Sequence, residues 1–114
     1  MSVKMTTRQV GDVTVVDAVG RITLGDGAST FRDTIRDLSA GGKKKLLLNL
    51  AEVSYIDSSG IGEMVSGFTT VTNQGGQVKL LNLTKRVQDL LQITKLYTVF
   101  EVHDDEAKAV RSFA

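Results

Sequence analysis

Hydrophobic and polar positions alternate near the start of the chain, and this period of two predicts a pair of β-strands. Val3–Val10 and Val13–Ile22 are rich in β-branched side chains, and Gly11-Asp12 separates the two segments. A glycine beside an aspartate between two such segments favours a tight turn. The opening of the chain is therefore predicted to be an antiparallel hairpin.

The period then changes from that of a strand to that of a helix. Phe31, Ile35 and Leu38 lie at positions i, i+4 and i+7, which places them on one face of a helix. Gly25-Asp26-Gly27 precedes this segment, and Gly41-Gly42 supplies the turn chemistry expected at a helix end. We therefore predict a first helix between the two glycine-rich segments.

A short, continuous apolar run at residues 45–50 predicts a central strand that is covered on at least one face. A second helical pattern begins after Ser58 and ends at the turn residues 73–76. The tetrapeptide Asp57-Ser58-Ser59-Gly60 therefore lies at a strand-to-helix junction. Because serine is a favoured N-cap, we predict that Ser58 caps this helix.

The last third of the chain continues the alternation of strands and helices. Residues 78–83 are predicted to form a strand, Thr84 to cap a third helix, and residues 97–102 to return to a strand. His103-Asp104-Asp105-Glu106 then places three acids where the positive end of a last helix would favour them. We interpret this acidic segment as a helix cap and not as a metal site.

The order of these elements predicts an α/β fold. The chain of 114 residues has no internal repeat and no linker, and it is long enough for one compact core. The order β-β-α-β-α-β-α-β-α indicates a mixed sheet of about five strands with about four helices packed on it. We expect a single domain that spans residues 1–114.

Composition and charge exclude several classes of function. The 14 Lys and Arg residues nearly balance the 13 Asp and Glu residues, so no strong field draws the chain to nucleic acid or membrane. The absence of cysteine excludes disulfides and thiolate chemistry and favours a reducing compartment. No apolar run approaches the ~20 residues of a transmembrane helix, and residues 1–7 lack a signal-peptide pattern. We expect a cytoplasmic protein.

The junction at Asp57-Ser58-Ser59-Gly60 lacks the usual partners of a catalytic serine. The Gly-x-Ser-x-Gly elbow of hydrolases is not matched, because Ile56 replaces its first glycine. The single histidine, His103, precedes an acidic cap and is predicted to be structural. One histidine without cysteine makes no usual zinc set, and no lysine-bearing phosphate loop follows Gly62. We predict no enzyme activity, metal or cofactor, with a Ser58 hydrolase as an alternative interpretation.

The longer string around this junction resembles the signature of a known family. Asn49-Leu50-x-x-Val53-x-Tyr55-Ile56-Asp57-Ser58-Ser59-Gly60-Ile61-Gly62 is similar to the motif of the STAS domain. This domain is named for sulfate transporters and anti-sigma factor antagonists, and the similarity is to its bacterial anti-anti-sigma branch. Gly20-Arg21-Ile22, the apolar strand and Gly75-Gly76 also fall in family order, so the resemblance covers nearly the whole chain.

The resemblance implies a phosphorylation switch. In this family, an anti-sigma factor that is also an ATP-dependent serine kinase modifies the serine after the aspartate, here Ser58, with Ser59 as the alternative. The unmodified domain binds this partner and frees a sigma factor, whereas the phosphorylated domain releases it until a phosphoserine phosphatase acts. One acceptor surface needs no dimer, so we expect a monomer when unbound. The partner-binding residues implied are Asp57, Ser58, Ser59, Gly60, Ile61, Gly62, Arg21, Thr23 and Asp26.

One segment departs from the family pattern. Many antagonists of this branch carry Gly-Glu-Leu-Asp where this chain has Gly20-Arg21-Ile22-Thr23. An arginine thus replaces one acid, the acid at position 23 is missing, and Asp26 is the nearby acid that could substitute for it. This departure leaves the partner's identity open. It also admits an alternative, a structural STAS module of a signalling scaffold or lipid-transport complex, in which both serines only cap the helix.

Overall fold

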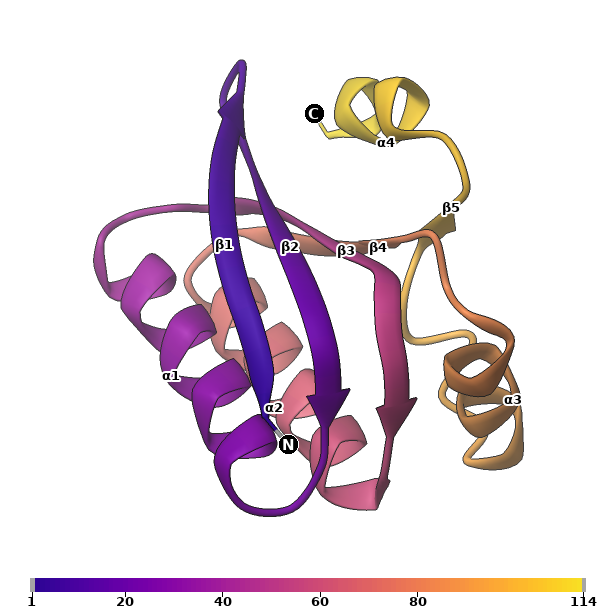
Figure 1. Cartoon of the computed structure of the whole chain (residues 1–114). Helices are drawn as coiled ribbons and strands as arrows, with labels where there is room; N and C mark the ends of the chain where they lie inside the picture. Colours follow the sequence, from indigo (N-terminus) through magenta and orange to yellow (C-terminus); the bar gives the residue numbers. More distant parts are fainter. Residues whose placement is uncertain (1, 114) are drawn as a thin grey trace.

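The computed structural model describes residues 2–113, which form one mixed sheet flanked by helices (Figure 1). The strand order β1-β2-β3-β4-β5 follows the sequence, with β1 antiparallel to β2 and parallel pairing from β2 onward. The predicted α/β class is therefore confirmed. The bounds of the elements are β1 (Val3–Val10), β2 (Val13–Ile22), α1 (Asp26–Ala40), β3 (Lys45–Ile56), α2 (Ser58–Asn73), β4 (Gln77–Leu81), α3 (Lys85–Ile93), β5 (Val102–His103) and α4 (Glu106–Ser112).

The sheet buries apolar side chains on both of its faces. On one face, α1 packs against α2, and their buried side chains, such as Phe31 and Met64, join those of the strands and of α3. On the other face, α4 covers a smaller cluster that includes Val15, Leu47 and Ala109. Removal of this apolar surface from water is the main driving force for the fold. No helix within residues 2–113 has the length and apolar character needed to cross a membrane.

Strand β3 is longer than the predicted segment 45–50, because it continues to Ile56. Its second half pairs with the end of β2, where Val53 lies opposite Gly20 and Ile56 opposite Ile22. The pairing register shifts twice in this region, so the polar and apolar positions lose a regular period of two. Because of this irregularity, the sequence pattern did not predict the second half of the strand. It also carries the chain directly to the junction at Asp57.

The predicted strand at residues 97–102 is mostly wrong. Only Val102–His103 pairs with β4, whereas the amide of Val99 donates to Leu96 O in a local turn. Phe100 of this segment is buried in the core instead. Its ring packs edge-on against that of Phe68, with 5.4 Å between the ring centroids. Strand β4 likewise ends at Leu81, before the predicted residue 83, because Asn82 adopts a left-handed backbone with φ of 58°.

Candidate functional site

The carboxylate of Asp57 closes the junction between β3 and α2. Asp57 has an extended backbone, and its Oδ1 accepts a hydrogen bond from Gly60 N at 2.9 Å. Asp57 is therefore the N-cap, and the prediction that Ser58 caps this helix is wrong by one residue. The carboxylate satisfies an amide that the helix leaves unpaired, and its charge also suits the positive end of the helix. Ser58 is the first residue of α2.

The second oxygen of the same carboxylate holds the turn between β2 and α1. Asp57 Oδ2 accepts a hydrogen bond from Leu24 N at 3.0 Å, and Asp57 N donates to Ile22 O at 3.4 Å. Burial alone would raise the pKa of Asp57, but hydrogen bonds from the backbone amides of Leu24, Gly60 and Ser59 lower it overall. The carboxylate is therefore ionised at neutral pH, and it joins two segments that are distant in sequence.

Ser58 presents its side chain on the surface of the first turn of α2. The residue is exposed, and its hydroxyl makes no hydrogen bond within residues 2–113. Ser59 is half-buried, and its hydroxyl also has no partner in this part of the chain. A hydroxyl at this position can accept a phosphoryl group whose charge is favoured by the positive helix end. Of the two serines, Ser58 is the more accessible acceptor.

The two glycines of the junction have different surroundings. Gly60 is buried, and a Cβ at this position would overlap the carbonyl oxygen of Ile22 and approach Ile56 Cγ1 within 2.7 Å. Gly60 therefore permits close packing of α2 against β2. Gly62 is exposed, and a Cβ there would meet nothing within 4 Å. Ile61 between them is only 4% exposed, so its side chain belongs to the core and not to the surface.

Three more of the predicted site residues lie in or beside the turn between β2 and α1, which Asp57 holds against this junction. Arg21 and Asp26 are exposed, and Thr23 is half-buried with its carbonyl oxygen bonded to Ala28 N at 2.8 Å. The sequence reasoning missed Leu24, which is 79% exposed and is held by Asp57. The feature that could have indicated Leu24 in the sequence is an apolar residue within an otherwise polar turn.

A second missed feature surrounds the ring of Tyr55. Arg21 lies opposite Tyr55 in the pairing of β2 with β3, and its guanidinium carbon is 5.3 Å from the ring centroid. Arg86, in the first turn of α3, places its guanidinium carbon 4.3 Å from the same centroid. Both distances fall within the range of cation–π interactions. No spacing rule could have joined Arg86 to Tyr55, because their contact depends on how α3 packs.

His103 has local partners, as its predicted structural role requires. Its Nε2 lies 2.5 Å from Glu101 Oε2 and 3.4 Å from Ser112 Oγ. Both contacts use the same ring nitrogen, so the histidine cannot relay a proton from a serine to a carboxylate as in a catalytic triad. The Ser112 hydroxyl donates instead to Ala109 O at 2.6 Å.

The acidic segment after His103 serves as a helix cap, as predicted. Asp105 Oδ1 accepts a hydrogen bond from Lys108 N at 3.0 Å at the start of α4. Within residues 2–113, no group of three or more His, Cys, Asp or Glu side chains is placed to hold a metal ion. Both oxygens of the Asp57 carboxylate accept hydrogen bonds from backbone amides.

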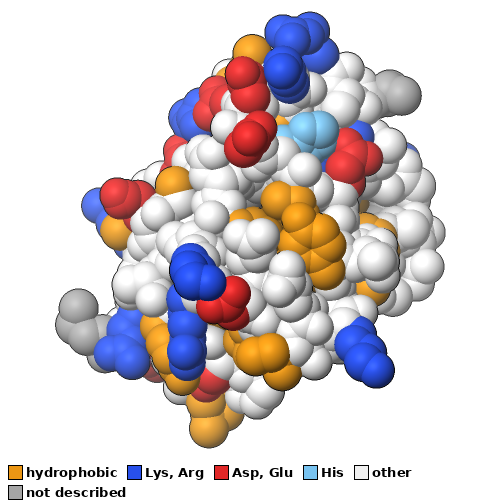
Figure 2. Space-filling model, turned by 90° about the vertical axis from the view of Figure 1, so that its right-hand side faces the viewer, with side chains coloured by type: hydrophobic (Ala, Val, Ile, Leu, Met, Phe, Trp, Pro, Cys, Tyr) orange, Lys and Arg blue, Asp and Glu red, His pale blue; other side chains and the backbone are white. Residues whose placement is uncertain are grey.

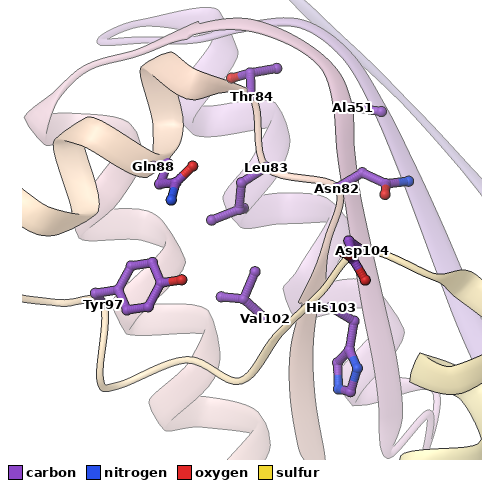
Figure 3. Close-up of a pocket in the computed structure, with 9 residues that line it drawn as sticks. All are labelled: Ala51, Asn82, Leu83, Thr84, Gln88, Tyr97, Val102, His103 and Asp104. Carbon is purple, nitrogen blue, oxygen red and sulfur yellow. The ribbon is translucent and has the colours of Figure 1, made fainter.

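A hollow of about 620 Å³ lies at the carboxyl ends of β4 and β5, beside the start of α3 (Figure 3). Tyr97 points its hydroxyl into this hollow, and Asn82, His103 and Asp104 line the opposite side. Figure 2 shows the histidine between acidic side chains and above a hydrophobic patch. The lining includes none of the predicted site residues, so the hollow is separate from the junction that carries Ser58.

Comparison with known proteins identifies the family of this arrangement. The family model of the STAS domain matches residues 4–109. The anti-sigma-B factor antagonist of Bacillus subtilis is 32% identical over 102 residues, which cover 90% of this chain and 92% of the relative. That of Listeria monocytogenes is 33% identical over 63 residues, which cover 55% of each chain.

Solved structures agree in fold. The crystal structure of an anti-sigma factor antagonist from Mycobacterium paratuberculosis superposes with a TM-score of 0.87 at 16% identity, covering 98% of this chain and 94% of that one. The phosphorylated form of the Bacillus cell fate determinant SpoIIAA superposes with a TM-score of 0.74 at 19% identity, covering 95% of this chain and 97% of that one. Its unphosphorylated form gives 0.70 at 19% identity, covering 95% and 96%. With the fold, the motif and the family model in agreement, this chain belongs to the STAS domain family.

Proposed function

We propose that this protein is an anti-sigma factor antagonist whose binding is switched by phosphorylation of Ser58. The observation that carries the proposal is the exposed Ser58 hydroxyl, without a hydrogen-bond partner in residues 2–113, in the first turn of α2. Relatives named anti-sigma-B factor antagonist support the functional class. The relative SpoIIAA, described in phosphorylated and unphosphorylated forms, supports a phosphorylation switch.

The proposed partner is an anti-sigma factor that is also a serine kinase using ATP. It binds the unmodified surface formed by the junction and the adjacent turn, and a phosphoserine phosphatase resets the modified protein. The protein acts in the cytoplasm as a monomer when unbound, without a cofactor and without direct contact to nucleic acid or membrane. Ser58 is a substrate of the partner and not a catalyst. The residues of this surface are Arg21, Thr23, Leu24, Asp26, Asp57, Ser58, Ser59 and Gly62.

The physical basis of the switch is the charge that a phosphate adds. Phosphorylation of Ser58 introduces nearly two negative charges, which the positive end of α2 stabilises, so the free domain keeps its fold. In the complex, the same charge lies beside the ionised carboxylate of Asp57 and must be desolvated against the partner. A penalty of about 3 kcal/mol weakens binding roughly a hundredfold. The modified protein therefore releases its partner while it remains folded.

The alternative interpretation is a structural STAS module of a scaffold or lipid-transport complex, in which both serines act only as helix caps. Asp57 already supplies the side-chain cap of α2, and Ser58 contributes no hydrogen bond to it among the described residues. The helix therefore has no need of the Ser58 hydroxyl, which favours a role for this residue on the surface.

The test is a phosphorylation and binding experiment with wild type, Ser58→Ala, Ser59→Ala and Ser58→Glu. Each purified protein is incubated with lysate of the source organism and ATP, and mass spectrometry locates any phosphate. We expect phosphate on wild type and Ser59→Ala but not on Ser58→Ala. In a parallel incubation without added ATP, the same kinase should be captured by wild type and Ser58→Ala but not by Ser58→Glu. Absence of phosphate at Ser58, with equal capture by all four proteins, would support the scaffold alternative.

A further inference from the structure

We infer that Arg21 and Arg86, placed against the ring of Tyr55, form a docking site for an acidic segment of the partner protein. Since it names the chemistry of the partner, this inference rests on the proposed function. We call these three residues the arginine–tyrosine cluster. Their side chains come from β2, β3 and the first turn of α3, and they meet at the end of the sheet that also carries the Ser58 junction.

The two guanidinium groups of the cluster are available to a ligand. Arg21 and Arg86 are exposed, and neither forms an ion pair within residues 2–113. Arg8 provides the contrast, because its guanidinium is bound by the carboxylates of Asp17 and Glu106. A guanidinium that contacts a ring keeps its N–H donors for a carboxylate, to which it can bind through two parallel hydrogen bonds. The cluster thus offers two such donor groups around one aromatic ring.

The cluster is held in place by the backbone on which it is built. Arg21 and Tyr55 are paired residues of neighbouring strands. The start of α3 is tied to β3 because the Thr84 hydroxyl donates to Val53 O at 3.2 Å and also accepts from Val87 N. Arg86 therefore approaches the ring from a capped helix and not from a mobile loop. Because Arg86 is already held in place, less conformational entropy is lost when a partner binds it.

The position of the cluster couples it to the Ser58 switch. Ser58 follows Tyr55 by three residues, so their Cα atoms are at most about 11 Å apart. This upper limit is somewhat longer than the Debye length of about 8 Å at physiological salt and well below that of about 30 Å at 0.01 M, so a phosphate on Ser58 acts on the cluster most strongly at low salt. It attracts the guanidinium groups and repels an acidic segment. An acidic partner is thus released by the same modification, whereas a basic partner would be attracted.

The composition of the neighbouring turn agrees with an acidic partner. The second strand ends in Gly20-Arg21-Ile22-Thr23, without an acidic side chain, so the cluster faces no carboxylate from this segment. Arg21 therefore adds a positive charge at the end of β2. The complementary segment on the partner is expected to carry Asp or Glu.

A hexaglutamate peptide is the probe for the test, followed by NMR of the ¹⁵N-labelled protein, including the arginine Nε–H signals. At low salt we expect chemical-shift changes at Arg21, Tyr55 and Arg86. Arg21→Gln/Arg86→Gln should bind at least about fivefold more weakly. The matched control is Lys43→Gln/Lys44→Gln, which removes the same charge from two exposed lysines at the opposite end of β3. Arg21→Lys/Arg86→Lys keeps the charge and checks that the planar guanidinium matters.

Several outcomes would overturn the inference. These are no binding to the wild type, shift changes elsewhere on the surface, or an equal loss of affinity in the lysine control. Tighter binding of a twelve-nucleotide single strand than of the peptide, lost in the arginine double variant, would assign the cluster to nucleic acid instead. The peptide experiment does not involve the kinase, so it tests the docking site even if Ser58 is never phosphorylated. Conversely, a Ser58 switch that works while the peptide fails to bind refutes only the docking site.

Discussion

The backbone amide of Leu24 donates a hydrogen bond to Asp57 Oδ2 at 3.0 Å, across 33 positions of sequence. The other oxygen of the same carboxylate caps α2 through Gly60 N. One side chain thus fixes both the turn that exposes Leu24 and the helix end that exposes Ser58. The aspartate before the serine is therefore a structural residue of the proposed binding surface, whatever else it contacts in a complex.

Replacement of Asp57 by alanine should destabilise the domain, whereas Ser58→Ala should not. Asp57→Ala removes a helix cap and a second hydrogen bond to a charged group, and we expect a loss of about 1–3 kcal/mol in the free energy of unfolding. Ser58→Ala removes no hydrogen bond and should stay within about 0.5 kcal/mol of wild type. Urea unfolding followed by circular dichroism measures both values. Equal stability of the two variants would show that Asp57 does not act as the cap.

The two glycines of the junction should respond in opposite directions to substitution by alanine. At Gly60 the added methyl group meets the backbone of Ile22, which cannot yield easily, so we expect a loss of about 2–4 kcal/mol. At Gly62 the methyl group enters open space on a helix, so we expect a gain of about 0.5–1 kcal/mol. Each variant serves as the control for the other in chemical denaturation. A tolerated Gly60→Ala would refute the close approach of α2 to β2.

A negative charge at Ser58 should leave the free domain folded and slightly more stable. Ser58→Glu places the charge at the positive end of α2, where it contributes about 0.3–1 kcal/mol at low ionic strength. The matched control is Asn73→Glu, which places the same charge on an exposed residue at the negative end and should destabilise by a similar amount. Thermal unfolding at low and high salt measures both effects. Loss of the native fold in Ser58→Glu would contradict a switch that acts on binding alone.

Stability should fall in acid partly because of Asp17. The hydrogen bond from Arg8, and next that from Asn49, lower the pKa of Asp17 below 3.8 despite partial burial. Since the folded pKa lies below the unfolded one, the stabilisation is present above about pH 4 and is lost as the pH falls through the folded pKa. The difference in unfolding free energy between wild type and Asp17→Asn should therefore be largest near neutral pH and shrink below about pH 4.

Arg8→Gln supplies the control for this pH dependence. Because Arg8 is the main cause of the lowered pKa of Asp17, the effect of Asp17→Asn should depend less on pH in the Arg8→Gln background. Urea unfolding of the four proteins from about pH 2.5 to pH 7 measures this coupling. An unchanged pH dependence would assign the acid sensitivity to other carboxylates.

The sequence pattern predicted the hairpin, the three longer helices and the position of the junction, because these depend on local periods and on turn residues. The caps at Thr84 and Asp105 were also predictable, since each has a short polar side chain directly before a helical pattern. At Asp57 two adjacent candidates compete, and the pattern chose Ser58. The carboxylate is the cap because its second oxygen also holds Leu24, a contact that no local rule contains.

The features that the sequence could not supply depend on pairing and packing between distant segments. The second half of β3 exists because it pairs with β2 across two shifts of register, which erase the local period. The cluster of Arg21, Tyr55 and Arg86 exists because α3 packs beside β3. The resemblance to the family supplied the acceptor serine, but not the division of roles between Gly60, which packs, and Gly62, which is exposed.

The strand order β1-β2-β3-β4-β5 has a consequence for synthesis of the protein. Each strand pairs with the strand that the ribosome produced before it, so no strand must wait for a later one to be inserted between existing neighbours. The hairpin can form first and serve as a template for β3, which adds parallel to it and carries the chain to Ser58. Growth of the sheet in this direction leaves only the outer edge of β1 and the edge of the newest strand unpaired, so no inner edge waits exposed for a later strand.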